Sequence, residues 1–266
     1  MMPATTTSHQ VKSEPSSVIG LSLNHAHAGW ADTVLFDDLS ITLERGRWTC
    51  LLGPSGVGKS MLLNMILGLA QKGVDSRGEV TCDDGQELAG RVSFMAQQDL
   101  LLPWLSVAEN VCLGARLRGD LGPVKRQGIY DQAYHHLGEV GLAGHEDTLP
   151  STLSGGMRQR VALARTLMED RPVVLMDEPF SALDAITRVR LQDMAAEALQ
   201  GRTVLLVTHD PLEALRLGHS IHVMSARPAK LDDPLVPSSP QPRHVDDPEV
   251  LSLQGELLSR LSEAVG

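Results

Sequence analysis

Continuous apolar runs alternate with helical spacing in the second half of this chain and predict an α/β fold. The segments PVVLMDEP (172–179) and TVLLVTHD (203–210) are apolar through their middle and are bounded by polar residues. Strands of this kind are buried on both faces, as in a parallel sheet that is covered by helices. Apolar residues at helical spacing fill 155–168, so we expect a helix beside this sheet.

The first half of the chain predicts further strands and one long helix. We expect strands near 18–25, 33–43, 47–52, 79–84 and 91–97, where apolar residues alternate or run together. Between them, the segment KSMLLNMILGLAQK (59–72) has apolar residues on nearly every side of a helix, which predicts burial on both faces.

Three stretches depart from this alternation. Residues 1–17 are rich in Thr, Ser and Pro and predict a flexible tail. Residues 105–145 carry helical spacing and few β-branched residues, so we expect a separate helical lobe. The segment 226–245 is Pro-rich and irregular, and an amphipathic helix over about 248–263 is expected to close the chain.

The charge and the cysteines narrow the possible partners. A net charge of −10, from 23 basic and 33 acidic residues, disfavours nucleic acid as a partner. Cys50, Cys82 and Cys112 lack metal-binding spacing and are expected to be reduced thiols in the cytoplasm. The N-terminus lacks the apolar core of a signal peptide, and no apolar run reaches the roughly 18 residues that span a bilayer. Another protein would have to anchor this chain at a membrane.

The segment GPSGVGKS at 53–60 fits the phosphate-binding pattern G-x-x-x-x-G-K-[ST]. Its glycines let backbone N–H groups point at phosphate oxygens, while Lys59 reaches the outer phosphates and the Ser60 hydroxyl binds Mg²⁺. The alternative is a glycine turn with a surface lysine, but the segment follows a predicted strand and opens a predicted helix, as the mechanism needs. We therefore expect Mg²⁺-ATP to contact Gly53, Pro54, Ser55, Gly56, Val57, Gly58, Lys59, Ser60 and Met61.

Two acidic residues, Asp177 and Glu178, end the strand predicted over 172–179. Acidic residues are common where a strand reaches solvent, so this feature alone does not indicate catalysis. Beside a phosphate-binding loop, however, Asp177 can hold Mg²⁺ and Glu178 can accept a proton from the attacking water.

A third motif, LSGGMRQR at 153–160, places Ser154, Gly155 and Gly156 directly before a predicted helix. A helix N-terminus of this kind attracts anions, although Ser-Gly-Gly alone is more often a plain helix cap. One phosphate group does not need two such sites from the same subunit. We therefore expect this element to cover ATP that is held by a second copy of the chain.

Over roughly 18–225, these three motifs resemble those of the ATP-binding cassette (ABC) ATPases. LSGGMRQR resembles the signature motif of that family, GPSGVGKS its Walker A motif and VVLMDE its Walker B motif. The resemblance implies an α/β P-loop NTPase fold with a RecA-like core, an N-terminal antiparallel β-subdomain and an α-helical subdomain inserted at about 100–165. Residues 226–266 would then form a short C-terminal extension.

The resemblance also implies roles for single residues. His209 in VTHD is similar to the switch histidine that contacts the γ-phosphate, and SALD (181–184) is similar to the D-loop. Gln97 is similar to the Q-loop glutamine that reaches metal and water; Gln98 is the alternative, but the six-residue spacing from Gln97 to a proline fits the family. The residue before Gln97 is Ala where relatives usually have Phe. Trp30 has the position of the aromatic residue that stacks on adenine, although it could instead be a core aromatic.

The family resemblance further implies partners. Two copies would pair head to tail and bind two ATP molecules, at the cytoplasmic face of the inner membrane, beneath a transmembrane permease that receives solute from a solute-binding protein. Trp104, just after the Q-loop, is expected at the permease contact; packing inside the helical lobe is the alternative. A soluble ABC ATPase of DNA repair, translation or cofactor assembly is a second possibility. Residues Gln97 and Leu153, however, are too close in the sequence for a long coiled coil to be inserted between them.

An importer is favoured because the cassette carries no fused membrane helices. The segment LLPW and the C-terminal pattern resemble the branch that takes up nitrate, sulfonate and taurine. Within it, WTCLLGPSGVGKS and MAQQDLLLPWLS most resemble ATPases for uptake of hydroxymethylpyrimidine, a thiamine precursor. His25 and His27 are expected to be solvent-facing strand residues that bind no metal.

Replacing Glu178 by Gln should lower the ATP turnover number by about 10²–10⁴, the usual worth of a positioned base. Nucleotide binding should survive, because the amide has the size of the carboxylate. A steady-state ATPase assay and an ATP titration would measure the two effects, and full activity in the variant would show that Glu178 is not the base.

Overall fold

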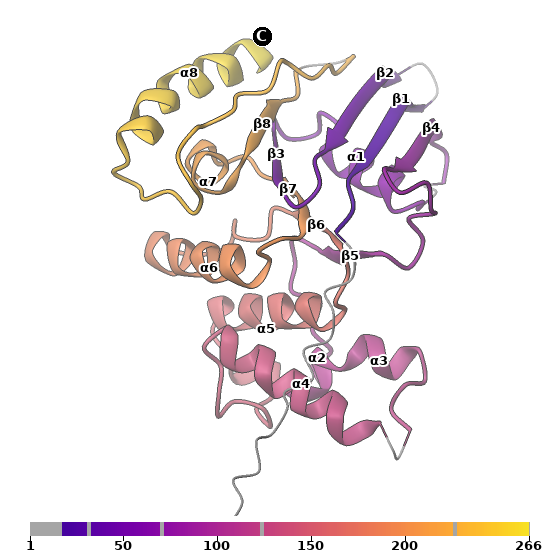
Figure 1. Ribbon diagram of the computed structural model, residues 1–266, viewed down its shortest axis with the longest axis vertical. Coiled ribbons are helices and arrows are strands. Elements are labelled where there is room, and N and C mark those ends of the chain that lie inside the picture. Colours follow the sequence, from indigo (N-terminus) through magenta and orange to yellow (C-terminus); the bar gives the residue numbers. More distant parts are fainter. Residues whose placement is uncertain (1–17, 31–32, 70–71, 123–124, 226–227, 266) are drawn as a thin grey trace, which may run out of the picture.

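The computed structural model describes residues 18–30, 33–69, 72–122, 125–225 and 228–265; the tail expected at 1–17 lies outside them. Within the described residues the strands form two sheets, a parallel sheet with the order β5-β6-β7-β3-β8 and an antiparallel sheet with the order β2-β1-β4 (Figure 1). The parallel strands are β3 (Trp48–Leu52), β5 (Val92–Met95), β6 (Val173–Asp177), β7 (Thr203–Val207) and β8 (Ser220–Val223).

The central strands of the parallel sheet are buried on both faces, as their apolar runs predict. Alternate residues of β6 reach two different hydrophobic clusters: Val174 and Met176 enter one, whereas Val173 and Leu175 enter the other. The sheet therefore separates two cores. Strand β8 was not expected from the sequence, although Ser and His alternate with apolar residues in it, because it has only four residues.

Helices cover both faces of this sheet. On one side lie α6 (Ala185–Ala198), α7 (Pro211–Leu217) and α8 (Pro248–Val265), whose buried residues belong to one cluster together with α5. On the other side, α1 (Lys59–Ile66) packs between the parallel sheet and the antiparallel strands β1 (Leu21–Trp30), β2 (Thr33–Leu43) and β4 (Asp75–Cys82). The final helix expected near 248–263 is confirmed.

Helix α1 ends six residues earlier than its apolar pattern predicts. Gly68 adopts a φ of 68°, and its N–H donates to the Met65 carbonyl over 3.0 Å while that of Leu69 donates to Asn64 over 2.8 Å. These two bonds form a Schellman motif, which terminates a helix at a glycine. The expected helix over 59–72 is therefore wrong at 67–69, because the apolar run continues past the glycine that stops the helix; residues 70–71 lie outside the described residues.

The first strand also differs from expectation. It begins at Leu21 and continues to Trp30, whereas the pattern predicted 18–25. His25 has a φ of 51° and the pairing register shifts between Leu23 and Ala26, so a bulge interrupts the alternation there.

The remaining helices lie together at the lower end of the view in Figure 1. They are α2 (Val107–Val111), α3 (Leu113–Leu117), α4 (Arg126–Glu139), the 3-10 helix η1 (Pro150–Thr152) and α5 (Gly155–Met168). Ser106 and Glu109 form a reciprocal capping box at the start of α2. Asn110 fixes the chain that enters this region: its Nδ2 donates to the carbonyls of Leu102, Leu105 and Ser106, and its Oδ1 accepts from the Leu102 N–H over 2.8 Å.

Replacing Asn110 by Ala should lower the free energy of unfolding by roughly 1–3 kcal/mol, because buried polar groups around it lose their partner. Urea unfolding followed by circular dichroism would measure the change. Asn24→Ala, which removes an exposed side-chain bond to Thr81, is the matched control and should stay within about 0.5 kcal/mol of the parent. An equal loss in both variants would contradict this role of Asn110.

Candidate functional site

The loop between β3 and α1 is folded around the amine of Lys59. The Lys59 Nζ donates to the carbonyls of Gly53 over 2.7 Å and Pro54 over 2.9 Å. Gly53, Gly56 and Gly58 have φ values of 154°, 74° and 120°, a region that favours glycine. Burial lowers the pKa of Lys59, and the negative charges of nearby Glu178 and Asp177 oppose this effect.

Two of the loop residues that were expected to contact ATP have side chains that face the protein core. Val57 and Met61 are buried in the core cluster shared by α1 and the antiparallel sheet. Only their backbone groups can face a phosphate. Ser55 and Gly56 lie on the exposed part of the loop.

A hydroxyl and a carboxylate meet beside this loop. The Ser60 Oγ donates to Oδ2 of Asp177 over 2.9 Å. Burial raises the pKa of Asp177; Glu178 raises it further, whereas the bond from Ser60 and the charge of Lys59 lower it. Oxygen atoms of this kind are the ligands that Mg²⁺ prefers, and a cation would favour the charged form of the buried carboxylate. The residues present therefore fit Mg²⁺.

Glu178 joins the ends of three neighbouring strands. Its Oε2 accepts a hydrogen bond from Nε2 of Gln97 over 3.1 Å, and Nδ1 of His209 lies 3.1 Å from the same oxygen. The Glu178 backbone has a φ of 45°, and its N–H donates to the Val207 carbonyl at the end of β7 over 2.8 Å. Gln97, rather than Gln98, thus contacts the acidic pair. The structure brings Lys59, Ser60, Gln97, Asp177, Glu178 and His209 into one connected site.

Comparisons with known proteins identify the family of the chain. Residues 36–181 match the family model for the ABC transporter. The chain belongs to the ABC transporter family. ATP-binding subunits of this family hydrolyse ATP, and the resemblance seen in the three motifs is confirmed.

Three relatives cover most of this ABC ATPase. An uncharacterized ABC transporter ATP-binding protein of Haemophilus influenzae is 43% identical over 85% of this chain and 92% of its own. Aliphatic sulfonates import ATP-binding proteins of Burkholderia cenocepacia and Rhodococcus jostii are each 41% identical; the matches cover 90% and 94% of this chain and 86% and 96% of theirs.

A solved structure supports the fold. A metal-chelate type ABC transporter in an inward-facing conformation matches with a TM-score of 0.67 over 81% of this chain and 83% of that chain, at 24% identity. The expected P-loop fold, with a parallel core and an antiparallel β-subdomain, is thus confirmed.

In this ABC ATPase the signature segment starts a separate helix. Ser154 caps α5, accepting a bond from the Met157 N–H over 3.2 Å, and Gly155 and Gly156 are the first residues of the helix. The bonds described for Ser154 stay inside α5. A Cβ on Gly156 would lie 2.8 Å from the Thr187 side chain, so this glycine permits close packing against α6.

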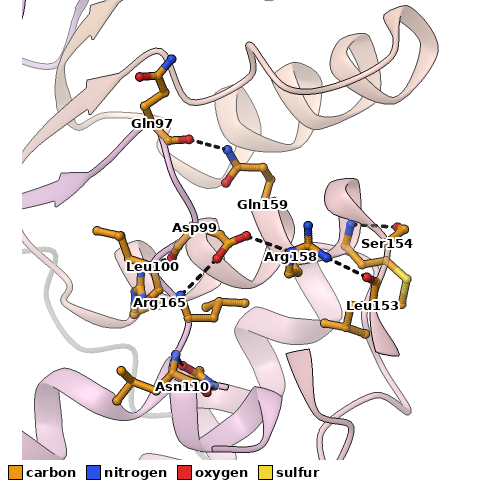
Figure 2. Close-up of polar contacts among 12 residues, drawn as sticks. Gln97, Asp99, Leu100, Asn110, Leu153, Ser154, Arg158, Gln159 and Arg165 are labelled. Carbon is orange, nitrogen blue, oxygen red and sulfur yellow. Dashed lines mark hydrogen bonds and ion pairs between the residues drawn. The ribbon is translucent and has the colours of Figure 1, made fainter. Parts of the chain in front are cut away.

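A buried glutamine connects α5 to the cluster around Glu178. Gln159 donates from Nε2 to the carbonyl of Gln97 and to that of Pro179, over 3.0 Å in each case. Figure 2 shows the first of these bonds. The sequence reading missed Gln159, although it lies within LSGGMRQR, because the motif does not show which residue reaches the neighbouring loops.

Two arginines of α5 hold the segment after Gln97 (Figure 2). Arg158 donates from Nε to Oδ2 of Asp99 over 2.9 Å and also bonds to the Leu153 carbonyl. Arg165, two turns later, donates to the carbonyls of Asp99 and Leu100. These contacts were also missed, since the partners lie about 60 residues apart in the sequence.

Trp30, predicted to stack on adenine, and Trp104, predicted to contact the permease, both expose side-chain surface. Trp30 lies at the end of β1, opposite Thr33, and is 40% exposed. Trp104 is 71% exposed, and nearby Leu100 is 58% exposed. The alternative that Trp104 packs inside the helical lobe is therefore wrong.

Other residues considered in the sequence show ordinary structural roles. His25 is exposed beside Asp38, as expected, whereas the His27 side chain is only 20% exposed and bonds to Asp37. Within the described residues no group of three or more His, Cys, Asp and Glu side chains could hold a metal ion. No helix of that part of the chain is long and apolar enough to cross a membrane.

All three cysteines are free and buried. Burial raises the pKa of Cys112 to about 11 and also raises the pKa values of Cys50 and Cys82. Their thiols therefore stay protonated at neutral pH.

Replacing Gly53 by Ala should weaken ATP binding. The new Cβ would lie 2.6 Å from the Met224 carbonyl at a φ of 154°, so the loop must leave the conformation that surrounds Lys59. A backbone strain of about 1–3 kcal/mol corresponds to roughly 5- to 150-fold in affinity. Calorimetric titration with ATP would measure this change. Gly138→Ala, on α4 with open space around its Cβ, is the control and should bind ATP normally; equal affinities would refute the prediction.

Proposed function

We propose that this ABC ATPase works as a head-to-tail homodimer that powers the import of a small solute. The observation that carries this proposal is the separation of the phosphate-binding loop and the signature motif within one chain. Lys59, Asp177 and Glu178 lie in one connected cluster, whereas Ser154 begins a separate helix, and the bonds described for Ser154 stay inside that helix. An exposed helix N-terminus suits the phosphates of ATP held by a second copy.

Each side chain of the cluster would have its own role. Lys59 and the backbone of the loop would bind the phosphates, and Ser60 and Asp177 would hold Mg²⁺, which neutralises charge on the transferred phosphoryl group. Glu178 would accept the proton of the attacking water. Its Oε2 is already held by Gln97 and His209, so its position is fixed before the substrate binds.

Gln97 and His209 would also contact the ligands directly. Gln97 would reach Mg²⁺ and the water, and His209 the γ-phosphate. Trp30, exposed at the end of β1, would stack on the adenine ring and contribute about 1–3 kcal/mol to affinity.

The exposed side chains of Leu100 and Trp104 would contact a transmembrane permease at the cytoplasmic face of the inner membrane. Large exposed apolar side chains that lie together mark interaction surfaces. They follow Gln97 by a few residues, and Asp99, directly before Leu100, is bonded to Arg158 near the start of α5. Docking of a permease here would therefore act on both the catalytic glutamine and the helix that faces the second ATP. A soluble ABC ATPase would not need this apolar surface.

An aliphatic sulfonate, received by the permease from a solute-binding protein, is the solute that the relatives favour. The relatives from Burkholderia cenocepacia and Rhodococcus jostii are named for aliphatic sulfonate import. Hydroxymethylpyrimidine, expected from the sequence resemblance, is named by neither of them nor by the Haemophilus influenzae relative. It remains the competing solute in the test below.

Replacing Trp104 by Ala should reduce recovery of the protein with its permease in membranes, while its affinity for ATP stays unchanged. Leu117→Ala is the matched control, because Leu117 is 78% exposed elsewhere in the helical region. The solute-binding protein that co-purifies with the complex would then be titrated with an alkanesulfonate and with hydroxymethylpyrimidine.

We expect the alkanesulfonate to bind and to stimulate ATP hydrolysis by the complete complex. Binding of hydroxymethylpyrimidine alone would overturn the sulfonate assignment. Wild-type protein that does not associate with any membrane protein would overturn the importer itself.

A further inference from the structure

Helix α7 follows His209 directly and is only seven residues long. A helix of this length is not stable without tertiary contacts. The position of His209 therefore depends on whatever holds the two ends of α7.

The N-terminal end of α7 is held by Asp210. Its Oδ1 accepts from the Leu212 N–H over 2.9 Å, and its Oδ2 accepts from Arg188 over 2.9 Å. Arg188 also donates to the Leu183 carbonyl over 2.9 Å. One arginine of α6 thus connects the SALD segment to the residue after His209.

The C-terminal end of α7 is held by Arg243, which lies after the last strand. The backbone N–H of Arg243 donates to the Arg216 carbonyl over 2.9 Å. Its guanidinium NH1 donates to the carbonyls of Leu215 over 2.9 Å and Gly218 over 2.8 Å. The last carbonyls of a helix have no partners within the helix. A single residue from the C-terminal segment 228–265 satisfies three carbonyls at this end.

The contact is reciprocal and buried. Arg216 of α7 donates from Nε to the Arg243 carbonyl over 3.0 Å and from NH2 to Asp193 of α6 over 2.6 Å. Arg216 and Arg243 are each 2% exposed. Hydrogen bonds of charged groups in such an environment are strong and directional.

Other charged residues of the segment bond mainly within the segment itself. Arg260 bonds to Asp232 and Glu256, and Glu249 accepts from Ser238. Arg243 is different because, besides Ser239 and Pro237 of its own segment, it bonds to the C-terminal end of α7. In Figure 1 the chain after β8 runs beside α7 before it returns as α8.

We propose that the C-terminal segment is a working part of the catalytic site, in which Arg243 is a positioning residue that fixes α7 and so fixes His209. The inference rests on the proposed contact of His209 with the γ-phosphate. It gives the segment a role in hydrolysis that is independent of the permease and of the solute.

The proposal predicts a specific pattern of nucleotide affinities. A looser α7 would misplace His209, and misplacement by about 1 Å can cost up to roughly 10²-fold in rate. ADP lacks the γ-phosphate, so its affinity should not depend on His209. General damage to the fold would instead weaken ATP and ADP alike.

The test compares full-length Arg243→Met with Arg260→Met, which removes an arginine from the same segment without touching α7. We expect Arg243→Met to lower kcat by about 10- to 100-fold and to lower ATP affinity, with ADP affinity unchanged. Arg260→Met should keep the parent values. Folded Arg243→Met with parent kcat, or with equal losses for ATP and ADP, would overturn the proposal.

A second variant covers the case in which Arg243→Met does not fold. Arg243→Lys keeps the charge, but a lysine ammonium cannot reach all the acceptors of the planar guanidinium. It should fold and show a smaller loss of kcat in the same direction. Parent kcat in folded Arg243→Lys, where Arg243→Met is unfolded, would reduce Arg243 to a purely structural residue.

His209→Ala separates this inference from the proposed function. If His209→Ala keeps parent turnover, the proposed role of His209 is wrong and the inference fails with it. If His209→Ala loses turnover while folded Arg243→Met does not, only the inference is wrong.

Discussion

The rest of the site depends on a single carboxylate oxygen, Oε2 of Glu178. Side chains that follow the two strands on either side of its own strand contact this oxygen. Gln97 follows β5, Glu178 follows β6 and His209 follows β7, and these three strands are adjacent in the parallel sheet. Parallel strands bring their carboxyl ends to one edge, where ligands bind in α/β proteins. The left-handed backbone at Glu178, tied to Val207, directs its side chain toward both partners. The buried strands are therefore the constraint on which the chemistry depends.

Contacts reach outward from this cluster to two distant parts of the molecule. Gln159 connects it to the signature helix, and the bond between Asp99 and Arg158 strengthens that connection. On the other side, His209 leads into α7, whose far end is completed by Arg243. The exposed segment after Gln97 and the C-terminal segment are thus both connected to the cluster around Glu178.

Local features of the sequence predicted the core of this structure well. The buried strands β6 and β7, the glycine loop and the acidic strand end each depend on residues that are close in the sequence. The end of α1 and the bulge in β1 were predicted poorly, since Gly68 and His25 change the backbone inside otherwise regular apolar patterns. The links of Asp99 to Arg158 and of Arg216 to Arg243 could not be predicted, because their partners meet only when the chain folds. The solute is a different case: no side chain of this chain is expected to touch it.

The three buried cysteines have a practical consequence for studying motion in this protein. Cys50, Cys82 and Cys112 are the only cysteines of the sequence, and burial keeps their thiols protonated. Maleimide and nitroxide reagents react with exposed thiolates, so the buried native cysteines should react little with these labels. A spin label on one engineered surface cysteine would test the proposed opening and closing of a homodimer without first removing the natural thiols.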